Sequence, residues 1–161
     1  ISKSLNKVIN KQVFHLSSNQ DFSAVIAACS SQSNKNRDGT WITDEMQLAY
    51  INLHKAGWAH SIEVWQDDEL VGGLYGIAIG EIFFGESMFA IKDNASKVAF
   101  VHLVNSLINK GYKLIDCQVS SEHLASLGAR EIKREEFMHC LSGLSDLSKS
   151  INTSPKDTFS V

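Results

Sequence analysis

An acid and an amide interrupt an apolar segment near residue 115, and they are the side chains best placed to do chemistry. Residues 114–119 read Leu-Ile-Asp-Cys-Gln-Val. A carboxylate in an apolar strand is costly unless it is paired, hydrogen-bonded or protonated, so Asp116 requires a compensating partner. Gln118, two residues later, offers both a hydrogen-bond donor and an acceptor. We therefore place a first candidate site at Asp116 and Gln118.

A second polar insertion follows an apolar run at residues 82–84. Glu86 and Ser87 are expected to end a strand over residues 81–87. If residues 114–119 form one strand, Asp116 and Gln118 share its face with Leu114, because side chains alternate. The two strands flank a predicted helix, so their ends can meet in one cleft. From the residues alone, an active site and a buried structural network remain equally open.

Several kinds of chemistry lack a signature in this sequence. The six histidines form neither HExxH nor a tight His/Cys cluster, so no metal site is expected. Gly72, Gly73 and Gly76 lie in a predicted strand and are not followed by Lys-Ser/Thr, which argues against a phosphate-binding loop. There is no G-x-S-x-G elbow of the kind that presents a catalytic serine.

Composition is that of an ordinary globular domain. Of 161 residues, 43% are hydrophobic and 20% charged, and the net charge of −3 argues against a broadly basic nucleic-acid binder. No apolar run approaches the roughly 20 residues of a membrane helix, and residues 1–12 do not resemble a secretory signal. The three cysteines are odd in number and widely spaced, so we expect reduced thiols in a cytoplasmic protein with no membrane association.

The pattern of apolar residues and turns predicts an α+β domain. Thr43 is a suitable N-cap and Gly57 a suitable C′ residue for one of the helices. Short turns predict an antiparallel meander, and a helix crossing to the 114–119 strand makes that strand parallel to its neighbour. We expect a catalytic domain over 1–145 and a Ser/Thr-rich tail over 146–161. The predicted helices are residues 1–10, 22–29, 44–56, 96–109, 122–126 and 134–144. The predicted strands are residues 61–65, 70–79, 81–87 and 114–119, and residues 30–39 are predicted to form a loop.

Seven ordered segments together resemble one known family, the bacterial leucyl/phenylalanyl-tRNA–protein transferases. The resemblance extends over roughly residues 1–145 and is more specific than any single motif. The segments are GTWIT at 39–43, HSIEVW at 60–65, ELVGGLYG at 69–76, GESMF at 85–89, NASK at 94–97, LIDCQ at 114–118 and HLASLGA at 123–129.

This resemblance implies an acyltransferase-like mixed sheet related to the N-acetyltransferases. It implies transfer of Leu or Phe, and possibly Met, from aminoacyl-tRNA to the N-terminal Lys or Arg of acceptor proteins. Those proteins are thereby marked for degradation by the N-degron route, without a metal, CoA or other cofactor. Two departures stand out: the family's N-terminal domain is missing ahead of Ile1, and the acetyltransferase pyrophosphate loop is absent. The alternatives are an N-acetyltransferase-like enzyme or an inactive binding fragment.

The resemblance also assigns roles to single residues. Gln118 contacts the attacking amine, and Asp116 orients or polarises Gln118. Glu86, beside Ser87, binds an amine, either that of the aminoacyl group or that of the acceptor, and Trp41 stacks on the terminal adenine of tRNA. An apolar pocket for the transferred side chain draws on Leu74, Phe83, Met88, Leu103 and Ile115, although ordinary core packing is the stronger interpretation for any one of these positions.

Overall fold

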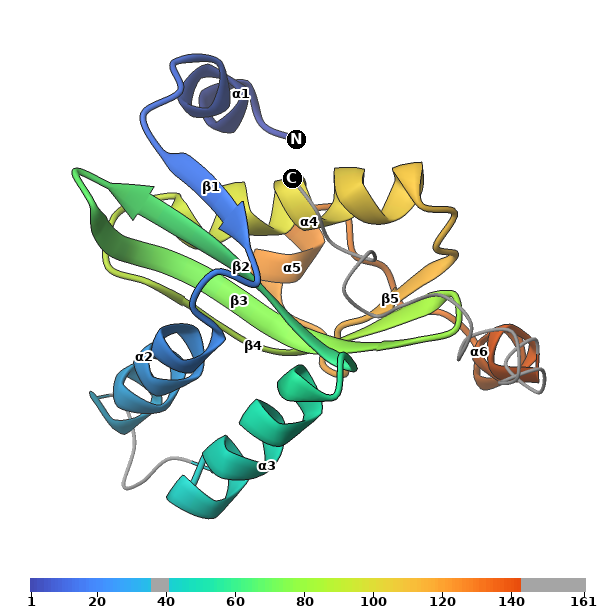
Figure 1. The fold of residues 1–161 in the computed structure, drawn as a ribbon. Helices are drawn as coiled ribbons and strands as arrows, with labels where there is room; N and C mark the ends of the chain where they lie inside the picture. The colour runs from blue at the N-terminus through green and yellow to red at the C-terminus, as the bar shows by residue number, and fades with distance from the viewer. Residues whose placement is uncertain (36–40, 143–161) are drawn as a thin grey trace.

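A single five-stranded sheet organises the part of the chain that the computed structural model describes, residues 1–35 and 41–142 (Figure 1). The strands are adjacent in chain order, β1-β2-β3-β4-β5. Their bounds are β1 (His15–Ser18), β2 (Ala59–Gln66), β3 (Glu69–Ile79), β4 (Ile82–Ala90) and β5 (Leu114–Asp116).

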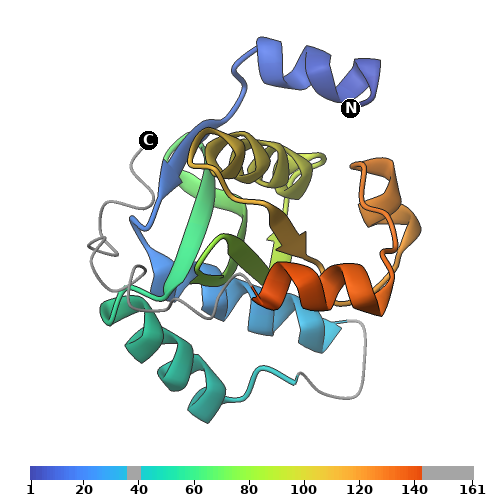
Figure 2. The same ribbon diagram turned by 90° about the vertical axis from the view of Figure 1, so that its right-hand side faces the viewer.

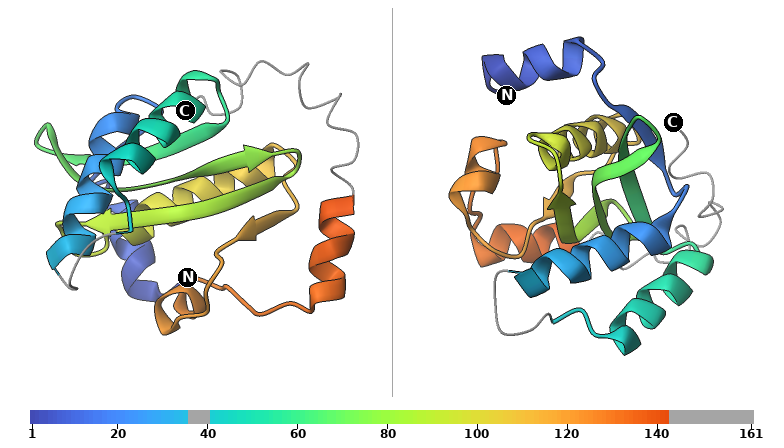
Figure 3. Two further views of the ribbon diagram at one scale, coloured as in Figure 1. Left: turned by 90° about the horizontal axis from the view of Figure 1, so that it is seen from below. Right: turned by 90° about the vertical axis from the view of Figure 1, so that its left-hand side faces the viewer.

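Helices cover both faces of the sheet (Figure 2). α4 packs across β2, β3 and β4 on one face, with α1 beyond it, while α2 and α3 cover the opposite face. α5 and α6 lie past the β5 edge (Figure 3). The helices are α1 (Lys3–Asn10), α2 (Phe22–Lys35), α3 (Asp44–Lys55), α4 (Ala95–Asn109), α5 (Glu122–Ser126) and α6 (Arg134–Ser142).

Local signals explain where these elements begin and end. The Thr43 hydroxyl accepts the backbone N–H of Met46 at the start of α3, and Gly57 follows its end with φ +86°. Asp67 and Asp68 both have positive φ, as a tight two-residue β2–β3 turn requires. The predicted cap, C′ glycine and hairpin turn are therefore confirmed.

The crossover from β4 through α4 to β5 gives the sheet its mixed character. β3 pairs with both β2 and β4 in antiparallel fashion, whereas β4 and β5 are parallel, with Ile82 opposite Leu114 and Phe84 opposite Asp116. A β-bulge lies between Tyr75 and Gly76 in the β3–β4 ladder. This is the predicted meander followed by a parallel strand, so the expected fold class is confirmed.

Two apolar cores lie on the two sides of the sheet. One lies under α4 and the other under α2 and α3, because alternate residues of β3, such as Leu74 and Tyr75, point to opposite faces. Close approach of α4 requires Gly72: a Cβ built there would lie 2.5 Å from the Cβ of Ala95.

A buried carboxylate ties β1 and β2 to the start of α2. Glu63 is fully buried and accepts hydrogen bonds from the Ser17 hydroxyl at 2.7 Å and from the Ser61 hydroxyl. The indole N–H of Trp65 donates to the Ser17 hydroxyl at 2.8 Å. Because its oxygens are satisfied by donors, this carboxylate can occupy the interior without a cation beside it.

Three sequence-based expectations are wrong. β1 was not anticipated, because its four residues include two serines whose partners come from β2. α2 continues to Lys35 instead of stopping at Cys29, and its apolar residues pack against β3 and β4. β4 continues to Ala90, since Met88 and Phe89 still pair with β3. The expected tail over 146–161 and the last residues of the expected helix lie outside the described residues.

No helix among the described residues is long and apolar enough to span a membrane. Among the described residues, Cys29, Cys117 and Cys140 form no disulfide, as expected from their number and spacing.

A buried histidine makes stability depend on pH. His60 is 3% exposed, and burial together with nearby His54 lowers the pKa of His60 from 6.5 to about 4. The unfolded chain therefore binds a proton more readily between these values, so stability is complete above pH 6.5 and falls as the pH drops towards 4. We expect His60 to account for roughly 2 kcal/mol of stability lost between pH 7.5 and pH 5.

Urea unfolding of the parent chain and of His60→Gln at both pH values measures this contribution. The variant should lose less stability than the parent on acidification, and His15→Gln at an exposed position controls for the loss of a histidine. Equal losses in the parent and His60→Gln would contradict the assignment.

Candidate functional site

The segment that carries Asp116 and Gln118 is a strand followed by a turn, not one strand. β5 ends at Asp116, and Gln118 has φ +63°, in the left-handed region. The two side chains therefore do not share one strand face as predicted. Asp116 is half-buried and Gln118 is exposed, so the expectation of a fully buried strand is also wrong. The turn itself explains the acid, because aspartate readily closes such turns through its side chain.

Two hydrogen bonds fix this turn. The Oδ1 atom of Asp116 accepts the backbone N–H of Gln118 at 2.8 Å. The side-chain Nε2 of Gln118 donates to the carbonyl oxygen of Gly85 on β4 at 3.1 Å. The contact of the Asp116 carboxylate with Gln118 is thus to its backbone N–H.

A cavity opens where β5 leaves the sheet. Pairing between β4 and β5 stops at Phe84 and Asp116, so the edge of β4 beyond Gly85 faces a space of about 260 Å³. Leu74 and Tyr75 both line this space although they point to opposite faces of the sheet, so the cavity reaches both faces at the gap between the strands. The five predicted pocket residues all line it: Leu74, Phe83, Met88, Leu103 and Ile115.

Glu86 and Ser87 add polar groups to the same cavity. They lie inside β4 next to the bulge, not at its end as predicted. Burial raises the pKa of Tyr50 on α3, and so do a hydrogen bond to Glu86 and the negative charge of Glu86. Burial likewise raises the pKa of Cys29, to about 12. A hydrogen bond to Ser87 acts in the opposite direction but has the smaller effect on this pKa. Glu86 is therefore the charged group at the polar end of this cavity, beside neutral hydroxyl and thiol groups.

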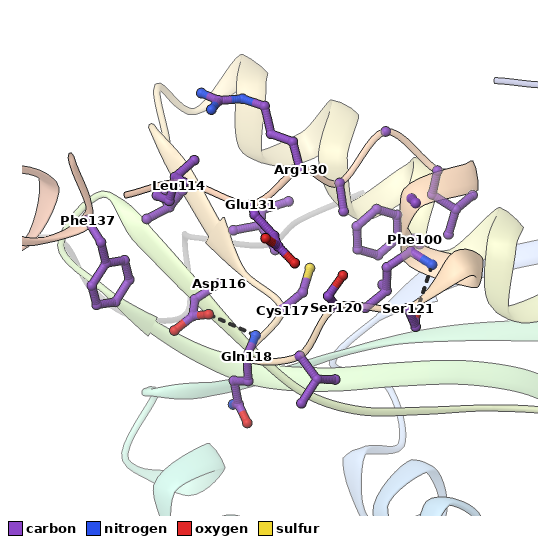
Figure 4. Close-up of a pocket in the computed structure, with 18 of the residues that line it drawn as sticks. Phe100, Leu114, Asp116, Cys117, Gln118, Ser120, Ser121, Arg130, Glu131 and Phe137 are labelled. Atoms are coloured by element: carbon purple, nitrogen blue, oxygen red, sulfur yellow. Dashed lines mark hydrogen bonds between the residues drawn. The ribbon is translucent and has the colours of Figure 1, made fainter. Parts of the chain in front are cut away.

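A wider groove of about 810 Å³ adjoins the cavity on the side of α5 and α6 (Figure 4). Asp116 and Gln118 line this groove and not the smaller cavity. Asp116 and Glu131 face into it, as Figure 4 shows. The two spaces share six wall residues, and so are neighbours: Phe100, Ile115, Cys117, Val119, Ser121 and Leu124.

Two of the charged side chains that line the groove form ion pairs at its rim. Arg130 contacts Glu136 at 3.0 Å, and Lys113 pairs with Glu81, all at exposed positions where ion pairs contribute little to stability. Burial, and secondarily Asp116, raise the pKa of Cys117, so this thiol is held neutral in the shared wall.

Trp41 is not brought into the site. Its side chain is 49% exposed just before α3, and it lines neither the cavity nor the groove. Within residues 1–35 and 41–142, no three His, Cys, Asp or Glu side chains gather where they could hold a metal ion.

Sequence reasoning missed several residues that line or border the site, among them Tyr50, Tyr75, Phe100 and Glu131. Tyr75 and Phe100 look like ordinary core residues, because each fits the apolar period of its strand or helix. Tyr50 on α3 approaches Glu86 only in the folded chain. Glu131 lies in a polar stretch with no motif, so no signal in the sequence could have singled it out.

The arrangement favours chemistry on a substrate that joins an apolar group to a polar one. An apolar chamber can hold a side chain such as Leu or Phe, with a carboxylate at its polar end. The wider groove carries an amide and a carboxylate fixed by a turn, which can orient a second reactant beside the first.

Comparison with protein families gives a match over most of the chain. The model of the family described as leucyl/phenylalanyl-tRNA protein transferase matches residues 1–142. The curated relative of that name from Pseudomonas fluorescens strain Pf0-1 is 54% identical over 142 residues, which are 88% of this chain and 62% of the relative. That from Pseudomonas aeruginosa strain PAO1 is 56% identical over 146 residues, 91% of this chain and 64% of the relative. The chain thus spans somewhat less than two thirds of their length.

Solved structures support the same fold. A predicted acetyltransferase with acetyl-CoA from Clostridium acetobutylicum superposes with a TM-score of 0.57 at 10% identity, over 75% of this chain and 92% of that one. An aminoglycoside N-acetyltransferase in complex with CoA gives 0.54 at 16% identity, over 75% and 90%. The fold expected from the sequence, that of the N-acetyltransferases, is confirmed.

The Asp116 turn can be tested by separating its geometry from its charge. Asp116→Ala removes the acceptor for the Gln118 N–H and should lower the free energy of unfolding by about 1 kcal/mol. Asp116→Asn keeps an acceptor oxygen at the same place and should leave stability within about 0.5 kcal/mol of the parent. Urea unfolding measures both, and equal stability of all three proteins would show that the turn does not depend on this bond.

Proposed function

Because the chain belongs to the leucyl/phenylalanyl-tRNA protein transferase family, we propose that it moves Leu or Phe from aminoacyl-tRNA to the N-terminus of an acceptor protein. Acceptors with N-terminal Lys or Arg are proposed, and Met as an additional donor residue. The acceptors would be marked for degradation by the N-degron route in the cytoplasm. These finer points rest on the family resemblance.

The observation that carries this proposal is the apolar cavity beside a fixed amide. Five apolar side chains predicted to hold a Leu or Phe side chain line one space, and the Gln118 turn lies at the adjoining groove. Met88 suits a pocket that must accept both shapes, because its thioether side chain is flexible. An aminoacyl group seated here would present its ester carbonyl to the junction of the two spaces.

Gln118 is suited to guide the attacking amine. Its Nε2 is committed to the Gly85 carbonyl, which directs the amide oxygen away from β4. We propose that this oxygen accepts a hydrogen bond from an N–H of the acceptor's α-amine. That bond orients the amine so that the lone pair of its nitrogen points at the ester carbonyl. A peptide bond then forms, the bond to the tRNA ribose oxygen breaks, and the proton lost by the amine ends on that oxygen.

The remaining partners fit around this step. Asp116 is a positioning residue, because its contact is with the backbone of Gln118. Glu86 binds an amine in the cavity. Trp41 lies outside both spaces, yet its half-exposed ring remains available to stack on the terminal adenine of tRNA. An N-acetyltransferase activity is the alternative, and it is favoured only by the shared fold.

A transfer assay tests the proposed donor. The chain is incubated with labelled Phe-tRNA, or separately with labelled acetyl-CoA, and an acceptor protein with N-terminal Arg. We expect label to move from Phe-tRNA and Leu-tRNA, and far less from Val-tRNA or Ile-tRNA, since β-branched side chains crowd a pocket narrow near Cβ. The same acceptor with its N-terminus acetylated is the control.

Each outcome of this assay has a distinct meaning. Transfer from acetyl-CoA alone would replace the proposal with an N-acetyltransferase. Transfer from neither donor would leave the chain as a binding fragment, and efficient transfer of Val would contradict the proposed pocket.

The role of Gln118 predicts a loss of turnover without a loss of folding. Gln118→Gly suits the left-handed backbone but removes the amide, so kcat should fall by about 10²- to 10³-fold while the urea midpoint stays close to that of the parent. Asn105→Ala removes an exposed amide on α4 and should change neither quantity. Unchanged turnover in Gln118→Gly would remove Gln118 from the mechanism.

A further inference from the structure

One of the residues that line the cavity carries a buried hydroxyl without a hydrogen-bond partner among the described residues. Tyr75 on β3 is fully buried and lines the cavity together with Glu86. Its hydroxyl has no partner among the described residues and is shielded from bulk water. Such a group costs free energy in the empty protein, so the fold alone gives no reason for its presence.

The ring of Tyr75, in contrast, is well accounted for. It meets the ring of Phe22 edge-on at 5.7 Å and that of Tyr50 at 5.2 Å. A phenylalanine at this position would keep both contacts and leave no polar atom unsatisfied. The hydroxyl therefore serves something other than packing.

Charge around the hydroxyl indicates what it could bind. Burial is the main cause that raises the pKa of Tyr75, followed by Cys29, Tyr50 and Glu86. The hydroxyl is thus neutral, and its oxygen can accept a hydrogen bond. Glu86 lines the same cavity and supplies negative charge, so the pair is suited to a cation that donates hydrogen bonds.

We propose that the Tyr75 hydroxyl and the Glu86 carboxylate together bind the protonated α-amine of the aminoacyl donor. This inference rests on the proposed function and deepens it. In an aminoacyl ester the amine and the side chain are attached to the same carbon. An amine whose side chain fills the space lined by Leu74 and Met88 would therefore lie in the same cavity as Glu86 and Tyr75. Glu86 is thereby assigned to the donor's amine, not to that of the acceptor.

The test compares two ligands that differ only in this amine. The first is phenylalanine joined by an amide to the 3′ position of an adenosine aminonucleoside, which mimics the end of Phe-tRNA and cannot be hydrolysed. The second carries 3-phenylpropanoyl in place of phenylalanyl, so it lacks the α-amine. Their Kd values are measured by calorimetry for the parent chain and for Tyr75→Phe.

Tyr75→Phe should weaken the amine-bearing ligand about ten- to hundredfold and leave the amine-free ligand unchanged, because a hydrogen bond to a charged group is lost only in the first case. Equal Kd values for the parent and the variant, or equal weakening of both ligands, would overturn the inference while leaving the proposed donor intact. If the parent chain binds neither ligand, the proposed donor class fails and the inference fails with it.

Stability gives an independent readout that needs no ligand. Tyr75→Phe should unfold at the same urea concentration as the parent or a higher one, since it removes an unsatisfied hydroxyl. Tyr112→Phe makes the same chemical change at a position that lines neither space, and it should not alter the ratio of the two Kd values. A clear drop in the unfolding midpoint of Tyr75→Phe would show that the hydroxyl is bonded within the protein, and would overturn the inference.

Discussion

The site depends on two parallel strands that stop pairing after three residues. Up to Phe84 and Asp116 the ladder between β4 and β5 is regular. Beyond Asp116 the chain turns through a left-handed Gln118, which the Asp116 carboxylate holds by its backbone N–H. Without that turn β5 could continue along β4, and its side chains would occupy the space where the cavity now lies. The carboxylate therefore acts first on backbone geometry, and any effect on the substrate follows from that.

The gap between the strands also explains why the cavity has an apolar and a polar end. A paired sheet separates its two faces completely, and successive residues such as Leu74 and Tyr75 are then never neighbours in one space. Where β5 has left, the cavity reaches both. The α4 side contributes aliphatic and aromatic groups, while the α2 and α3 side contributes Glu86 with its tyrosine neighbours. This arrangement suits a substrate that carries an amine beside an apolar group, with the apolar group on the α4 side and the amine near Glu86.

The fold does not by itself choose the donor. The two acetyltransferase structures described above are only 10% and 16% identical to this chain, so the shared sheet says little about which acyl group is held. We propose that this choice comes from side chains placed on the common fold: the apolar residues around Met88, the carboxylate of Glu86 and the amide of Gln118. The rest of the domain, including the buried Glu63 network and the two cores, supports the sheet that holds these groups in position.

The sequence by itself determined the order of the elements other than β1, most of their boundaries and the family. Caps, turn residues and apolar periods act within a few residues, so Thr43, the Asp67-Asp68 turn and Gly57 could be interpreted directly. The pair at Asp116 and Gln118 stood out as an acid and an amide in an apolar segment, whereas their roles and the five apolar pocket residues followed from the family resemblance. Only the tertiary structure decided how β5 ends, that Asp116 contacts a backbone N–H, and that Tyr50, Tyr75 and Glu131 border the site. The reason is that these features depend on contacts between segments far apart in the chain, and a left-handed glutamine or an unsatisfied hydroxyl has no signature in the sequence.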